Sequence, residues 1–81
     1  MEIPEIVFRK NLQGALDFMK ASSIYKSNGA APAQLADLFV KAGICFENSG
    51  NEDKAGMEFY RAEILGNLSA FARYELYKRG Y

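Results

Sequence analysis

The side chains that could carry out acid–base chemistry in this chain are carboxylates in one short segment. They are Glu52, Asp53, Glu58 and Glu63. A pair of carboxylates can act as general acid and general base when their surroundings move their pKa values apart. The helical spacing, however, places them with Lys54 and Arg61 on a face that we expect to be solvated. Lys54 precedes Glu58 by four residues, the spacing of an ordinary surface ion pair. We therefore interpret these carboxylates as surface charges.

The other residue types disfavour the remaining common catalytic arrangements. The chain of 81 residues has no histidine, the commonest general base near neutral pH and the commonest metal ligand. Cys45 is the sole cysteine, so it has neither a histidine to activate it nor a partner for an internal disulfide. The glycines are scattered singly and form no phosphate-binding loop. We predict that the protein is not an enzyme and has no catalytic, metal-binding or cofactor-binding residues, and no cofactor.

A C-terminal run is the one place where basic and aromatic residues alternate. Its members are Phe71, Arg73, Tyr74, Tyr77, Lys78, Arg79 and Tyr81. Such a run could stack on bases and bind phosphates. The net charge is zero, with 10 basic and 10 acidic residues, so nucleic acid is the least favoured partner. We prefer the interpretation that Phe71, Ala72 and Leu76 cover the core while the tyrosine rings lie half-buried with their hydroxyls in water.

Composition and patterning indicate one intracellular domain, residues 1–81. Apolar residues make up 49% and charged residues 25% of the sequence, an ordinary globular mixture. No apolar run approaches the length of a membrane span, and the first residues, MEIPEIVFRK, lack the order of a signal peptide. The lone cysteine fits a reducing compartment. We expect a soluble, cytoplasmic protein without a membrane partner.

The apolar spacing predicts an all-α fold, a small antiparallel bundle of three to four helices. Pro4 suits the first position of a capping helix over residues 4–27, and Gly14 in its middle predicts a close helix contact. A helical hairpin follows over residues 33–65; in its turn, Gly50 suits the position after a helix end and Asn51 an N-cap. A break at Gly66 would begin a fourth helix over residues 68–79. The alternative is one long third helix.

The hairpin carries a seam of small and aromatic residues at helical spacing. Its members are Phe39, Ala42, Phe46, Ala55, Phe59 and Ala62. Together with Gly43, this pattern resembles a single tetratricopeptide repeat over residues 36–69, which has an aromatic, a small pair and an aromatic on its first helix, and Ala, aromatic, Ala on its second. Ala42 stands where that family usually has Leu, and Asn67 where it often has Pro. Antiparallel packing alone also generates such patterns, so a hairpin of another kind is the alternative.

The resemblance implies a protein-binding scaffold and suggests its binding face. The family lines its peptide groove with the first helix of each repeat, and the matching positions here are Asp37, Val40, Lys41, Ile44, Glu47 and Asn48. Because Val40 and Ile44 occupy the central places, we expect an apolar groove for an amphipathic helix. Tyr74 and Tyr77 are further candidate contacts. The expected partner is another protein, with a second copy of this chain as the alternative.

Overall fold

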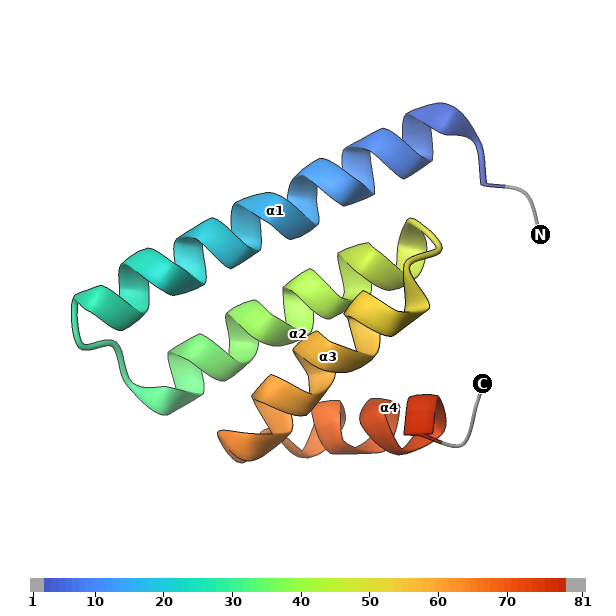
Figure 1. Ribbon diagram of the computed structural model, residues 1–81. Coiled ribbons are helices and arrows are strands. Elements are labelled where there is room, and N and C mark those ends of the chain that lie inside the picture. Colours follow the sequence, from blue (N-terminus) through green and yellow to red (C-terminus); the bar gives the residue numbers. More distant parts are fainter. Residues whose placement is uncertain (1–2, 79–81) are drawn as a thin grey trace.

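The computed structural model describes residues 3–78, which form four helices and no strand (Figure 1). The helices are α1 (Glu5–Ser27), α2 (Pro32–Asn48), α3 (Glu52–Ile64) and α4 (Leu68–Lys78). The predicted all-α fold is confirmed, and the alternative of one long third helix is wrong. Arg79, the predicted end of the last helix, and Tyr81 of the C-terminal run lie outside the described residues.

Each helix packs against the next one along the chain, and α2 lies between α1 and α3 (Figure 1). Side chains of α1 and α3 line shared hollows, whereas side chains of α2 and α4 meet at Glu47. The helices therefore form two layers, α1 with α3 and α2 with α4. The smallest dimension of the Cα trace is 14 Å. That thickness fits two layers, because the axes of packed helices lie about 8–10 Å apart.

The turns that separate α2, α3 and α4 follow the same local rule. Gly50 and Gly66 adopt φ values of 82° and 92°, which glycine tolerates without a steric penalty. The residue after each glycine donates its N–H to a carbonyl of the preceding helix, Asn51 to Phe46 at 2.9 Å and Asn67 to Ala62 at 3.1 Å. These bonds belong to the Schellman motif, in which a left-handed residue ends a helix. The predicted breaks at Gly50 and Gly66 are confirmed.

The helix N-termini agree only in part with expectation. The Asn67 Oδ1 accepts a hydrogen bond from the Ala70 N–H at 3.0 Å and so caps α4. Asn51 occupies the N-cap position of α3 as predicted, but its side chain donates instead to the Ser49 Oγ at 3.0 Å. Pro4 is the N-cap residue of α1 and not its first helical residue.

The predicted seam forms most of the core, which also includes Ala15, Ala36 and Ala70. Ala42, Ala55, Phe59 and Ala62 have no exposed surface, and Phe46 is 2% exposed. Phe39 is half-buried and packs against this cluster. Gly14 of α1 lies against Cys45 of α2, where an added Cβ would come within 3.2 Å of the sulfur. The predicted close contact at Gly14 is confirmed.

The predicted core face of α4 is wrong. Phe71 is 46% exposed and Leu76 49%, and Ala72 is also exposed. The face that packs on α3 consists of Ala70, Tyr74 and Tyr77, spaced at helical intervals. Tyr77 lies across Gly56, where an added Cβ would be 3.4 Å from the tyrosine Cβ. Small residues at Ala70 and Gly56 leave room for flat tyrosine rings, so the tyrosines take the place that the prediction gave to Phe71 and Leu76.

Among the described residues, no helix combines the length and the apolar character that crossing a bilayer requires.

Candidate binding surfaces

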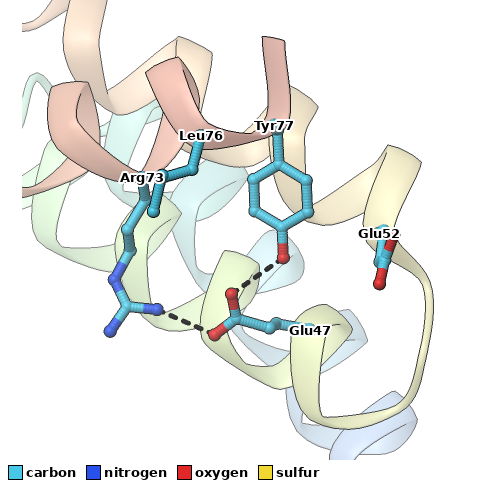
Figure 2. A pocket seen from close by; sticks show the side chains of 5 residues that line it. All are labelled: Glu47, Glu52, Arg73, Leu76 and Tyr77. Atoms are coloured by element: carbon cyan, nitrogen blue, oxygen red, sulfur yellow. Dashed lines mark hydrogen bonds and ion pairs between the residues drawn. The ribbon is translucent and has the colours of Figure 1, made fainter. Parts of the chain in front are cut away.

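Glu47 near the end of α2 joins the two helices of its layer. Its Oε1 accepts a hydrogen bond from Arg73 Nη1 at 2.8 Å, and its Oε2 accepts one from the Tyr77 hydroxyl at 2.8 Å (Figure 2). Arg73 and Tyr77 are four residues apart on α4, so they present their polar ends on the same side of that helix. Both oxygens of the carboxylate are thus held by α4.

These residues line a pocket of about 440 Å³, called here the Glu47 pocket (Figure 2). Its lining residues are Glu47, Glu52, Arg73, Leu76 and Tyr77. The side chains of Glu47 and Arg73 remain 37% and 41% exposed, so their ion pair is open to a ligand. Leu76, half-exposed, adds an apolar wall. The pocket can hold a residue with an apolar body and a polar tip.

The Tyr77 hydroxyl is held in its protonated form. Burial raises the pKa of this phenol, and the hydrogen bond to the Glu47 carboxylate and the charge of that carboxylate raise it further. A phenolate there would lose its donor and face a negative group. Tyr77 therefore acts at neutral pH as a hydrogen-bond donor that orients Glu47, and not as a base.

The predicted strip on α2 is only partly available for binding. Val40, Ile44 and Glu47 follow one line along the helix, which leads toward the Glu47 pocket. Val40 and Ile44 are half-buried and pack against the core. Asp37 and Lys41 are exposed and pair with each other, with Lys41 Nζ 2.9 Å from Asp37 Oδ2. The strip is therefore half-buried at its centre and leads to a pocket at Glu47.

Tyr74 does not belong to the Glu47 pocket. Its ring lies against Tyr60 of α3, with ring centroids 4.9 Å apart, and the Lys78 ammonium lies 5.4 Å from its centroid. It lines a second hollow, of about 290 Å³, between α3 and α4. Of the two tyrosines predicted as contacts, only Tyr77 joins Glu47.

Sequence reasoning did not assign Arg73 and Leu76 to a pocket with Glu47. The sequence pattern groups Arg73 with the C-terminal run of basic and aromatic residues and predicts that Leu76 lies in the core. The four-residue spacing of Arg73 and Tyr77 is a signal that they share a helix face. Nothing in the sequence pairs that face with a glutamate more than twenty positions earlier.

The interpretation of Glu58 as a surface charge is wrong. Glu58 is 2% exposed, and its Oε1 accepts a hydrogen bond from Arg61 Nη1 at 2.7 Å. The expected partner Lys54 instead has its ammonium 5.8 Å from the centroid of the Phe46 ring. Burial raises the pKa of Glu58, against the opposing effect of the Arg61 guanidinium. Leu16 and Met19 of α1 line the same hollow as Glu58, and helical periodicity within α3 alone does not predict this neighbouring helix.

Two observations bear on metal and thiol chemistry. Residues 3–78 contain no group of three or more His, Cys, Asp and Glu residues placed to hold a metal ion. Cys45 is half-buried, and burial raises the pKa of its thiol. A raised pKa keeps the sulfur protonated and lowers its nucleophilicity at neutral pH.

No family model matches the chain, and neither a curated protein nor a solved structure is significantly similar to it. The resemblance of residues 36–69 to a tetratricopeptide repeat therefore stays a prediction from the sequence.

Proposed function

We propose that the protein is a non-catalytic protein–protein interaction module that binds a segment of another protein along the α2–α4 layer. The observation that carries the proposal is the Glu47 pocket at the end of the line formed by Val40 and Ile44. An apolar line that ends in a polar pocket suits an amphipathic helix, whose apolar side chains are anchored at regular intervals. A cytoplasmic location is part of this proposal.

The layering supports the tetratricopeptide-like interpretation. In such a repeat the first helix lies on the binding face and the second behind it, and α2 and α3 would take these two roles. In this interpretation α1 and α4 would be half-repeats that cover the two sides of the hairpin, because a single repeat cannot bury its own faces. The Glu47 contact to α4 would then extend the binding face beyond α2.

The proposal is tested by changing the line and the pocket and measuring capture of partners from the source cells. We expect the Val40→Asp, Ile44→Asp double variant and the Leu76→Asp variant each to lose the partners that the unchanged chain retains. Ile6→Asp is the matched control, since Ile6 is 74% exposed on α1. Helicity from circular dichroism must be the same in all variants. Retention of every partner by both α2–α4 variants would rule the proposal out.

Self-association is the second candidate function, favoured by α4. Phe71 and Leu76 are 46% and 49% exposed, although both are large apolar residues on a short helix. An isologous contact between two copies would cover them. Sedimentation across the micromolar range distinguishes the two functions. Self-association predicts that the mass of the unchanged chain rises with concentration, whereas the Phe71→Ser, Leu76→Ser variant stays a monomer. A constant monomer mass of the unchanged chain excludes self-association.

A further inference from the structure

A second groove runs along the other layer of the molecule, between α1 and α3. It consists of two hollows of about 220 Å³ and 330 Å³, and Arg61 lines both. Phe46 contributes to the floor of the first hollow and Phe39 to the floor of the second. We call the two hollows together the α1–α3 groove.

The walls of the groove carry large apolar side chains that remain exposed. Leu16 of α1 is 50% exposed, and Met57 and Ile64 of α3 are 56% and 64% exposed. Met57 and Ile64 are seven residues apart, two helical turns, and so lie on the same side of α3. A line of exposed apolar residues above an aromatic floor is the kind of surface that partner helices bind.

Three of the four charged residues that line the groove are cationic. Lys26, Lys54 and Arg61 line it, and Glu58 is its single acidic residue. Glu58 is buried and already bonded to Arg61. Within residues 3–78, neither Lys26 nor Lys54 forms an ion pair. The groove therefore offers positive charge to whatever covers its apolar walls.

The groove has the length of a helical segment. Its α2 floor extends from Leu35 to Phe46, and the eleven steps between these residues correspond to about 16 Å along the helix axis. A partner helix of about three turns would span it. Such a helix would place apolar residues on the floor and present acidic residues to Lys26 at one end and Lys54 at the other.

We propose that the α1–α3 groove binds an amphipathic helix of a partner protein, with acidic residues along the edges of its apolar stripe. This site is separate from the α2–α4 layer and goes beyond the function proposed above. Phe39 and Val40 are consecutive residues, and consecutive residues of a helix point about 100° apart, so the two faces of α2 are distinct. Each site can exist without the other.

A second copy of this chain is a poorer occupant than an acidic helix. If this groove packed against the same groove of a second copy, the cations Lys26, Lys54 and Arg61 of one copy would lie near those of the other. Like charges at close range oppose association. Charge complementarity thus favours an acidic partner.

The test uses two synthetic helical peptides of about 16 residues. Both carry leucines at positions i, i+3, i+4 and i+7, and the flanking positions are glutamate in one and lysine in the other. Fluorescence anisotropy measures their binding to the full chain. We expect the acidic peptide to bind at least about tenfold more tightly than the basic one. Equal affinities, or no binding of the acidic peptide up to about 1 mM, would overturn the proposal.

Three variants establish where the acidic peptide binds. The Met57→Glu, Ile64→Glu double variant should bind the acidic peptide at least about tenfold more weakly, because both residues are exposed on the walls of the groove. Lys26→Glu, Lys54→Glu should reverse the preference between the two peptides. Lys10→Glu, Lys20→Glu changes the net charge equally at exposed positions that do not line the groove and should leave the preference intact.

The remaining outcomes are also decisive. If the Lys10→Glu, Lys20→Glu control shows the same loss as Lys26→Glu, Lys54→Glu, the peptide is attracted by net charge alone and the proposal is overturned. A dimer that Met57→Glu, Ile64→Glu converts to a monomer would assign the groove to a second copy instead. The Val40→Asp, Ile44→Asp variant should bind the peptide normally, so failure of the α2–α4 function and failure of this site are distinguishable.

Discussion

Phe59 of α3 packs directly on the backbone of Gly43 in α2, and a Cβ at Gly43 would come within 2.5 Å of its ring. The ring has no exposed surface, so it lies wholly among other protein atoms and cannot swing out into solvent without opening the core. This contact sets the separation of the two helices whose outer faces form the candidate binding surfaces.

Gly43→Ala is expected to destabilise the protein by about 1–3 kcal/mol, the usual cost of overpacking a core. Alanine is the better helix former by about 1 kcal/mol, so a net loss would show that packing outweighs propensity. Gly14→Ala is the matched control, because its Cβ would meet only the Cys45 sulfur, at 3.2 Å. Urea unfolding measures both. An equal effect at the two glycines would contradict the special role of the Phe59 contact.

Tyr77→Phe removes the hydroxyl that binds Glu47 while keeping the ring on Phe59, where the centroids are 5.8 Å apart. The Arg73 bond to Glu47 remains, so we expect a loss of about 0.5–1.5 kcal/mol in the free energy of unfolding. A loss above about 3 kcal/mol would imply that the ring itself had moved.

The same tyrosine should make stability fall at alkaline pH. The pKa of Tyr77 is raised in the folded protein, so above pH ~10 the unfolded chain ionises while the folded chain keeps its proton. The folded state then binds more protons, and the free energy of unfolding decreases as the pH rises. Between about pH 9 and 11, the free energy of unfolding should fall more steeply with pH in the unchanged protein than in the Tyr77→Phe variant. Parallel curves would contradict the raised pKa.

Glu58→Gln tests the buried carboxylate. Because the folded pKa of Glu58 is raised, stability from this group is lost as the pH rises from the unfolded value of about 4.3 through the folded value. Glutamine can keep the hydrogen bond to Arg61 without carrying a charge, so the Glu58→Gln variant should have a free energy of unfolding at pH ~7 at least equal to that of the unchanged protein. Any difference in its favour should shrink as the pH falls toward ~4 and the buried carboxylate of the unchanged protein becomes protonated. Glu5→Gln, at a side chain 73% exposed, is the control.

Asn67→Ala removes the side-chain cap of α4 and should cost about 0.5–2 kcal/mol. Asn51→Ala is the matched control, because Asn51 has the same position before α3 but makes no capping bond. Hydrogen exchange of the Ala70 amide should accelerate in Asn67→Ala and not in Asn51→Ala. Equal exchange in both would show that the cap does not hold the start of α4.

Local features of the sequence were sufficient to predict the helices and their main seam. Gly50 and Gly66 mark helix ends because a left-handed residue there needs no neighbour other than its own helix. The seam from Phe39 to Ala62 follows from helical periodicity and from a turn too short for any arrangement but an antiparallel one. Such signals depend on residues close together in the chain.

The tertiary structure alone decided which side of α4 is buried, why Glu58 is enclosed and what Glu47 binds. Each involves a residue from another helix: Gly56 makes room for Tyr77, Leu16 lines the same hollow as Glu58, and Arg73 reaches Glu47 across twenty-six positions. Periodicity assigns a residue to a face of its own helix but does not identify the helix that will meet that face. Both candidate binding surfaces lie between helices that are not neighbours along the chain, and local periodicity does not identify such pairs of helices.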